Sequence, residues 1–268
     1  MLALKRASLL TSRRALSALR PIEGGAVPGL VGGPVGAPAV VVIQEWWGLT
    51  DLIRSHAEAV VAQGYRVAVP DIYKGAVGVD AEEASHLMGN LDFPCAVAEI
   101  GELSATLRAE GSPKVGVVGF CMGGALTLGA ASKAPFDAAA PFYGVNFDLL
   151  DAAALKDTPV QGHFGKLDEM VGFSDPTAAA QLEAVLKAAG NDAVECHLYD
   201  GVGHAFMNPE PAPFESFEER REKMGFPAYD MRQADLAWGR LLDFFLEHLA
   251  AAPPGRTDLP IHTPVTDL

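Results

Sequence analysis

The sequence predicts a single α/β domain in which helices cover both faces of a mostly parallel central sheet. From residue 39 onward, short apolar runs rich in β-branched residues alternate with segments of helical period. Strands that alternate with helices form parallel βαβ units, and strands that are apolar at nearly every position are buried on both faces. A chain of 268 residues, 49% of them hydrophobic, is long enough to bury such a core.

The expected strands are six short apolar runs. They span residues 39–43, 65–69, 114–119, 137–143, 159–164 and 193–199. Between these runs, apolar side chains recur at helical spacing. The first helix follows a cap at Thr50 and Asp51 and stops at Gly64. The other helices include residues 97–107, 125–131, 182–189 and 236–249. No internal repeat or second domain is visible, so the expected domain spans residues 39–250.

The amino-terminal segment has a charge unlike that of the rest of the chain. Residues 1–20 contain five basic side chains and no acid, whereas the whole chain has a net charge of −14. A basic, acid-free segment bearing Ser and Leu is typical of an organellar transit peptide, and an ordinary basic terminus is the alternative. We therefore predict a mitochondrial protein, with a plastid as the alternative. Without a transit peptide, the expected location is the cytoplasm.

Two further segments flank the expected domain. Residues 21–38 are rich in Gly and Pro, which do not sustain a helix or a central strand, so they are expected to form a linker. Residues 251–268 are expected to form a carboxy-terminal tail.

Composition argues against several classes of partner. A chain with 20 Lys and Arg against 34 Asp and Glu lacks the basic excess that binding to nucleic acid requires. No apolar run reaches the ~18 residues of a membrane-spanning helix. Three cysteines are too few, and odd in number, for a disulfide framework. The spacing of His, Cys and acidic residues predicts no metal site.

The most informative stretch is Gly-Phe-Cys-Met-Gly-Gly at residues 119–124. It joins an expected strand to an expected helix, and Gly119 and Gly123 flank Cys121 at the spacing of the G-x-S-x-G nucleophile elbow, with Cys in place of Ser. A helix amino terminus directs N–H groups at an oxyanion and lowers the pKa of a thiol. A buried structural Cys is one alternative. A phosphate-binding loop is another, but the glycine spacing differs from G-x-G-x-x-G.

Two more residues follow later strands in the order that an α/β-hydrolase requires. A cysteine nucleophile needs an imidazole to move its proton and a carboxylate to hold that imidazole. Asp168 follows the expected strand 159–164, and His204 follows the last one. Glu169 or Asp175 could take the place of Asp168, and either candidate could be an ordinary turn residue. The order nevertheless predicts a triad at the carboxyl edge of the sheet.

Glu45 is a further candidate because it follows the first expected strand beside Trp46 and Trp47. An isolated acid at a strand end is usually solvated, but two tryptophans make a partly apolar mouth. Such surroundings raise the pKa of a carboxyl and fit it for proton exchange. In α/β-hydrolases, this turn also supplies the second N–H group of the oxyanion hole.

The chain closely resembles the dienelactone hydrolase (carboxymethylenebutenolidase) family from about residue 38 to residue 250. The resemblance implies hydrolysis of a lactone or ester by a triad of Cys121, His204 and Asp168, without a cofactor. The motifs that carry it are QEWWGL at 44–49, GY and VPDIY within 64–73, GFCMGG at 119–124, FYG at 142–144 and DGVGHAF at 200–206.

The resemblance also implies roles for residues around the triad. Glu45 would contact the resting thiol and help form the thiolate when substrate binds. The backbone N–H groups of Trp46 and Met122 would form the oxyanion hole. Tyr143 falls at a pocket position of the family, and we expect Trp47 and Phe206 to line the same substrate pocket.

The chain differs from the bacterial dienelactone enzymes in the residues that bind the substrate carboxylate. Those enzymes hold the substrate carboxylate with arginines, one of them four residues after the triad His, where this chain has Asn208. The segment after Tyr73 that would carry the other arginine contains none up to residue 90. Arginine is the natural partner of a carboxylate, so the sequence argues against dienelactone itself as substrate. Residues 208–230 are expected to form a long polar loop past His204.

The sequence thus predicts a hydrolase of small esters or lactones that forms an acyl-enzyme on Cys121. A thioesterase or acyl-transfer enzyme would use the same residues. A non-catalytic thiol redox sensor could use Cys121 alone, but would not require Asp168 and His204. The expected partner is a small-molecule substrate, with no nucleic acid and no membrane, and the expected state is a monomer or homodimer.

Overall fold

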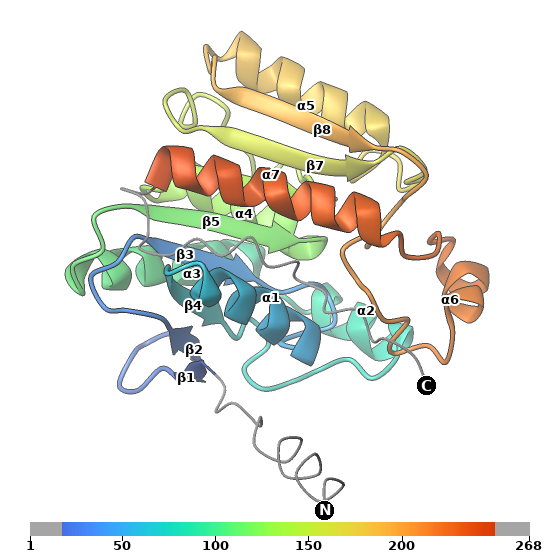
Figure 1. Ribbon diagram of the computed structural model, residues 1–268, viewed down its shortest axis with the longest axis horizontal. Coiled ribbons are helices and arrows are strands. Elements are labelled where there is room, and N and C mark those ends of the chain that lie inside the picture. Colours follow the sequence, from blue (N-terminus) through green and yellow to red (C-terminus); the bar gives the residue numbers. More distant parts are fainter. Residues whose placement is uncertain (1–17, 250–268) are drawn as a thin grey trace, which may run out of the picture.

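The computed structural model describes residues 18–249 and folds them around one eight-stranded sheet (Figure 1). The strand order is β1-β2-β4-β3-β5-β6-β7-β8. From β4 to β8 all neighbours pair in parallel, and only the β1 and β2 edge is antiparallel. The α/β-hydrolase fold with a mostly parallel sheet is therefore confirmed. Most of the expected transit peptide and the whole expected tail lie outside the described residues.

The six expected strands are present, each within one residue of its predicted bounds. Every residue of the first five is buried, which agrees with their mostly apolar sequences. The strands are β3 (Ala39–Ile43), β4 (Arg66–Pro70), β5 (Val115–Phe120), β6 (Ala138–Phe142), β7 (Val160–Gly165) and β8 (Val194–Tyr199).

The linker predicted for residues 21–38 is wrong at Pro21 and at Gly29–Gly32, which belong to strands. Strands β1 (Leu19–Pro21) and β2 (Gly29–Gly32) form a hairpin, and β2 pairs with β4. A Cβ at Gly29 would lie 2.2 Å from the carbonyl oxygen of Val69, so the glycine allows close approach at the sheet edge. The domain accordingly begins before residue 39, and β1 includes Leu19 and Arg20, the last two residues of the expected transit peptide.

Helices cover both faces of the sheet, as expected. One face is covered by α3 (Phe93–Ala109), α4 (Met122–Lys133) and α5 (Pro176–Ala188), and the other by α1 (Asp51–Ala62) and α7 (Met231–Leu249). Successive strand residues serve opposite faces: Val41 packs with the first set and Val42 with the second. No helix within residues 18–249 is long and apolar enough to cross a membrane.

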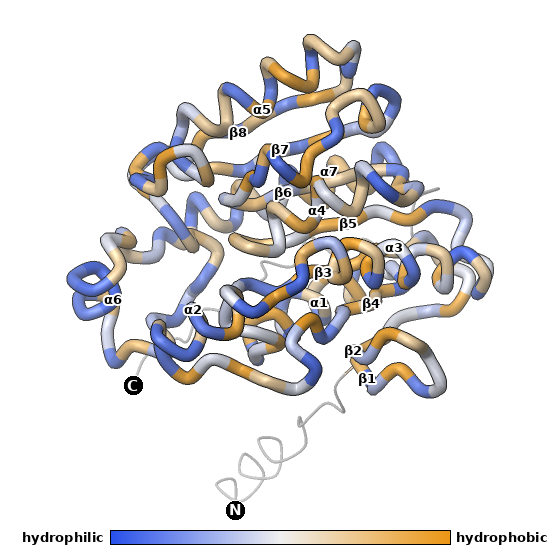
Figure 2. Tube along the Cα trace, turned by 180° about the vertical axis from the view of Figure 1, so that it is seen from behind, coloured by the Kyte–Doolittle hydropathy of each residue, from blue (hydrophilic) through white to orange (hydrophobic). Residues whose placement is uncertain are grey.

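Two helices were not expected, α2 (Ala81–Gly89) and α6 (Phe217–Met224). The second lies inside the predicted loop 208–230. It is mostly hydrophilic in Figure 2, so it lacks the apolar stripe on which the sequence prediction relied. A capping signal was nevertheless present, because the Ser216 hydroxyl accepts a hydrogen bond from the backbone N–H of Glu219.

Candidate active site

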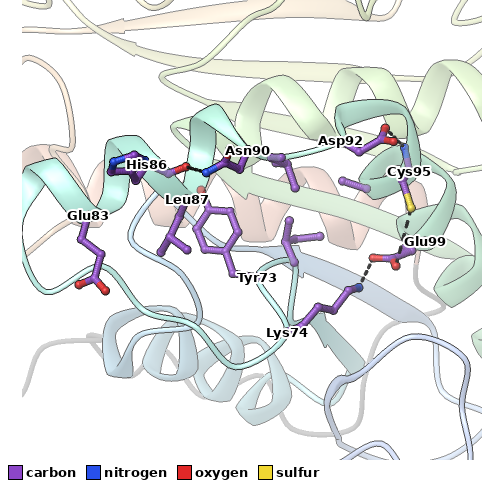
Figure 3. A pocket seen from close by; sticks show the side chains of 12 residues that line it. Tyr73, Lys74, Glu83, His86, Leu87, Asn90, Asp92, Cys95 and Glu99 are labelled. Carbon is purple, nitrogen blue, oxygen red and sulfur yellow. Dashed lines mark hydrogen bonds and ion pairs between the residues drawn. The ribbon is translucent and has the colours of Figure 1, made fainter.

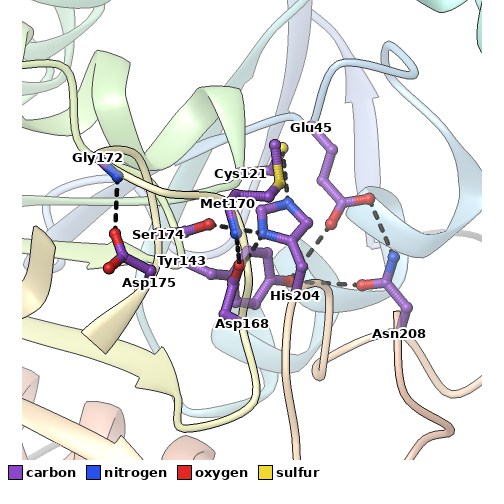
Figure 4. A network of polar contacts seen from close by, with 10 residues as sticks. All are labelled: Glu45, Cys121, Tyr143, Asp168, Met170, Gly172, Ser174, Asp175, His204 and Asn208. Carbon is purple, nitrogen blue, oxygen red and sulfur yellow. Dashed lines mark hydrogen bonds and ion pairs between the residues drawn. The ribbon is translucent and has the colours of Figure 1, made fainter. Parts of the chain in front are cut away.

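Four of the predicted site residues meet at the carboxyl edge of the sheet. Glu45 follows β3, Cys121 follows β5, Asp168 follows β7 and His204 follows β8. Parallel strands all end at this edge, so residues far apart in the sequence lie together there (Figure 4).

Cys121 occupies the sharp turn between β5 and α4. Its backbone lies at φ 56° and ψ −116°, a conformation that costs free energy for a residue with a side chain. A Cβ at Gly119 would lie 2.1 Å from the carbonyl oxygen of Gly123, and one at Gly123 would lie 2.7 Å from that of Ile43. Glycine is thus required on both sides, and the structure contains the elbow that the sequence predicts.

A continuous chain of hydrogen bonds joins the three predicted triad residues. The His204 ring lies with Nε2 3.1 Å from Cys121 Sγ and Nδ1 2.9 Å from Asp168 Oδ2. Met170 N–H donates to the other Asp168 oxygen at 3.0 Å. The competing acids lie elsewhere: Glu169 is exposed, and Asp175 caps α5. Asp168 is therefore the carboxylate that contacts His204.

Ser174 is a site residue that the sequence did not indicate. It is fully buried, and its Oγ lies 3.0 Å from His204 Nδ1, beside Asp168 (Figure 4). Nδ1 carries one hydrogen, which Asp168 accepts. The Ser174 hydroxyl oxygen then acts as a second acceptor of the same hydrogen. A serine between Asp168 and α5 has no sequence signal that marks it, since only the folded loop brings it to the ring.

Electrostatics favour a protonated His204. Burial alone lowers the pKa of His204, but the charge of a Cys121 thiolate and the hydrogen bonds to Asp168 and Cys121 raise it to about 10. These two neighbours therefore favour the protonated form of the imidazole.

Glu45 is buried in a hydrogen-bonded network of its own. Asn208 Nδ2 donates to one carboxylate oxygen at 3.1 Å, and the Tyr143 hydroxyl donates to the other at 3.3 Å. Burial raises the pKa of Glu45, although the Asn208 hydrogen bond and the charge of His204 oppose this shift. The direction agrees with the prediction from the neighbouring tryptophans.

The expected pocket residues occupy different places. Trp47 lines a cavity of about 710 Å³ together with Glu45 and Asn208. Tyr143 is fully buried beside Glu45 instead. Phe206 packs against Tyr143 and other aromatic rings in the core, so it is placed among core residues rather than along that cavity.

A second cavity, of about 520 Å³, lies between α2 and α3 (Figure 3). Tyr73 lines it and donates from its hydroxyl to Met122 Sδ at 3.2 Å, so this cavity borders the residue after Cys121. Among residues 18–249, no group of three or more His, Cys, Asp or Glu side chains is arranged to hold a metal ion.

Known proteins of one family are similar to this chain. A sequence model of the dienelactone hydrolase family matches residues 27–249. A carboxymethylenebutenolidase from Pseudomonas putida is 32% identical over 70% of this chain and 84% of its own length. A putative carboxymethylenebutenolidase from Aquifex aeolicus is 30% identical over 85% of this chain and 96% of its own length.

Solved structures show the same fold. A putative dienelactone hydrolase from Klebsiella pneumoniae superposes with a TM-score of 0.67 at 22% identity, covering 85% of this chain and 98% of its own. The family match spans most of the chain and includes every strand from β2 to β8. The chain is therefore an ester-cleaving hydrolase that belongs to the dienelactone hydrolase family.

Proposed function

We propose that this protein hydrolyses small esters or lactones through an acyl-enzyme on Cys121. The observation that carries the proposal is the chain of contacts from Sγ through the His204 ring to Asp168, at 3.1 and 2.9 Å. A nucleophile, a base within hydrogen-bond reach and a carboxylate that orients the base are the parts that acyl transfer requires.

The steps follow from these positions. The Cys121 thiolate attacks the substrate carbonyl carbon, a C–S bond forms, and the carbonyl oxygen becomes an oxyanion. The backbone N–H groups of Trp46 and Met122 would stabilise that oxyanion. The C–O bond then breaks, and the His204 imidazolium gives its proton to the leaving alkoxide. Neutral His204 next takes a proton from water, and the resulting hydroxide attacks the thioester, which releases the acid and the thiolate.

Glu45 would exchange a proton with the thiol when substrate binds. Its burial and raised pKa support this role, because a carboxyl that titrates closer to neutral pH accepts and returns protons more readily. The contacts with Asn208 and Tyr143 hold the carboxylate at the site until then.

The cavity beside Glu45 supports an uncharged, partly apolar substrate. Its walls include the apolar side chains of Trp47, Val77 and Pro213. Acidic side chains, Asp51 and Glu210, lie on the same lining and repel carboxylates. Asn208, which replaces the expected arginine, offers its amide to Glu45. A lactone or ester without its own carboxylate fits these surroundings better than dienelactone.

The deciding experiment is steady-state hydrolysis by the full chain of a panel of esters, lactones and thioesters, with Cys121→Ala as the control. We expect turnover of esters or lactones that falls by at least ~10³-fold in the variant. Unchanged turnover in Cys121→Ala would exclude the elbow as the site. Faster turnover of thioesters would redirect the proposal to a thioesterase, and turnover of none would contradict hydrolysis of small esters.

We also propose that the amino-terminal basic segment directs import into mitochondria and that the imported protein is a monomer or homodimer. The proposal of import is supported by the five basic side chains, and the lack of acidic ones, within residues 1–20. Sequencing the amino terminus of protein from its native source tests the first point, since an intact Met1 would contradict it. Light scattering tests the second.

A further inference from the structure

A short segment after α6 lies against the triad histidine, and the proposed reaction has not used it. Helix α6 stands outside the two helical layers, beyond the carboxyl ends of the strands (Figure 1). Phe226 follows this helix, and the centroid of its ring lies 4.7 Å from that of the His204 ring. The chain after α6 therefore brings a side chain to the triad from outside the loops that carry the triad residues.

Local sequence determines how the chain leaves α6. Gly225 ends the helix with φ 74°, a left-handed conformation that glycine adopts without strain, and its N–H donates to the carbonyl oxygen of Arg221 at 2.9 Å. Pro227 disfavours a helical backbone at the residue before it, which is Phe226. The helix thus stops at a defined residue, and the next side chain lies against His204.

Two further contacts hold this segment in place. Arg220 is only 3% exposed, and its Nη2 donates to the carbonyl oxygen of Pro227 at 2.9 Å. Pro227 also lies against the loop that carries His204, because a Cβ at Gly203 would be 2.8 Å from Pro227 Cδ. The segment is therefore tied to α6 on one side and to the loop after β8 on the other.

Aromatic side chains surround the His204 ring, which is only 3% exposed. Within residues 18–249, three rings have centroids near that of His204: Tyr143 at 5.2 Å, Phe173 at 6.1 Å and Phe226 at 4.7 Å. Tyr143 is fully buried, whereas Phe226 is half-buried. The closest of the three rings thus lies between the imidazole and solvent.

Exclusion of water matters at this imidazole because its nitrogens are already engaged. Water at the ring would compete with Asp168 for the Nδ1 hydrogen and would screen the attraction between His204 and its charged neighbours. A phenylalanine ring packed against the imidazole offers no competing hydrogen bond, and it limits how far the imidazole can tilt. One contact can therefore keep the ring dry and hold its orientation.

We propose that Phe226 is a positioning residue that excludes water from the His204 imidazole and keeps this ring oriented between Cys121 and Asp168. The residue acts through the imidazole, and Arg220 supports it by holding Pro227. The inference rests on the proposed function for its effect on the rate. Its effect on the Nδ1 hydrogen is independent of turnover.

The first test follows the Nδ1 hydrogen of His204 by NMR of protein labelled with ¹⁵N-histidine, with the resonance identified by its loss in His204→Gln. A hydrogen shielded from water exchanges slowly, so we expect the resonance in the parent protein and its loss in Phe226→Ala. Phe93→Ala is the matched control, because it truncates a half-buried ring on α3 that packs against another part of the core. It should keep the resonance.

Three results of this experiment would overturn the proposal. They are a resonance that persists in Phe226→Ala, a resonance that is lost equally in Phe93→Ala, and a resonance that is already missing from the parent protein.

Steady-state kinetics of the same variants measure the effect on the rate. We expect kcat to fall about 10-fold in Phe226→Ala with KM little changed, a smaller loss than the ~10²-fold that a misplacement of about 1 Å can cause. Phe226→Tyr keeps the ring and should retain both the rate and the resonance. An unchanged kcat in Phe226→Ala would contradict the positioning role.

Two more variants keep the proposal testable if Phe226→Ala fails to fold. Phe226→Leu keeps an apolar side chain without the flat ring, and a protein that matches the parent in both measurements would overturn the proposal. Arg220→Met removes the donor to Pro227 and should also lose the resonance, whereas Arg221→Met, which alters an exposed neighbour, should keep it. A resonance that is lost in Phe226→Ala while the parent protein hydrolyses no ester would refute the proposed function and leave the exclusion of water standing.

Discussion

Two buried carboxylates lie at the same edge of the sheet, and their surroundings differ in one respect. Asp168 is 4% exposed and contacts the His204 imidazole at 2.9 Å, with a backbone N–H on its other oxygen. Glu45 is 2% exposed and contacts only neutral donors directly, an amide and a hydroxyl. The two acids are therefore equally buried. Asp168 directly contacts the imidazole of His204, whereas Glu45 has no cationic side chain in direct contact.

The difference teaches that partners, more than burial, decide what a buried acid can do. A carboxylate that accepts the Nδ1 hydrogen of an imidazole holds the ring in one orientation and tautomer. A carboxyl among neutral donors keeps a raised pKa and can take up a proton during a reaction. Two acids on one edge of the sheet are thereby suited to different tasks.

The largest expected effect on catalysis is at Asp168. Asp168→Asn should lower kcat/KM by about 10⁴-fold, because an amide can donate to Nδ1 and so favour the wrong imidazole tautomer. Steady-state kinetics on the best substrate of the panel measures this loss. Glu169→Gln, which alters an exposed neighbour, should be close to the parent protein. A loss of less than tenfold in Asp168→Asn would mean that Asp168 does not orient His204.

Substitution of Glu45 should lower the rate less than substitution of Asp168. Glu45→Gln keeps the shape and the partners but removes proton exchange, so kcat should fall by roughly 10²-fold, the lower range for general acid–base catalysis. The pH profile of kcat/KM provides the check, since its acid limb should change in the variant. A profile and rate identical to those of the parent protein would rule out proton exchange at Glu45.

A smaller loss is expected at the second acceptor of the His204 ring. Ser174→Ala removes one hydrogen bond of the His204 ring and leaves Asp168 in place, which corresponds to a decrease of about 2–10-fold in kcat. Ser132→Ala is the matched control, because Ser132 is a buried serine that bonds the carbonyl oxygen of Leu128 away from the site. Equal losses in both variants would point to general destabilisation rather than to an effect on His204.

The smallest effect is on stability and has the opposite sign. The folded pKa of Glu45 is raised above its ordinary 4.5, so the native protein holds a proton more tightly than the unfolded chain. Native stability falls as pH rises through that folded pKa. Glu45→Gln should therefore raise Tm at neutral pH, by ~2–4 °C for each kcal/mol of penalty removed. The difference in Tm between Glu45→Gln and the parent protein should shrink below about pH 4.5. Calorimetry of both proteins at neutral pH and at that lower pH measures it, and a difference that grows on acidification would contradict the prediction.

The parts of this molecule that depend on local sequence could be predicted from the sequence alone. The strands follow from mostly apolar runs, and the Cys121 elbow follows from glycines at fixed spacing. Asp168 and His204 could be placed because each lies in the loop that follows a strand, and the topology brings the strand ends together.

The rest depends on contacts between distant segments. The β1–β2 hairpin forms in a Gly/Pro-rich stretch because β4 offers an edge to pair with. Ser174 reaches the His204 ring only through the folding of its own loop, and no sequence spacing marks it. Helix α6 carried a capping signal, but its polar surface lacked the periodicity that would have singled it out.

The two outer strands have a consequence for association between molecules. Strand β1 is three residues long and ends in Pro21, which has no N–H to offer a neighbouring chain. At the opposite edge, β8 carries the exposed, charged Glu195. Short length, proline and outward charge are the devices by which natural sheets avoid adding strands from other molecules. Each end of this sheet is thus protected against edge-to-edge aggregation.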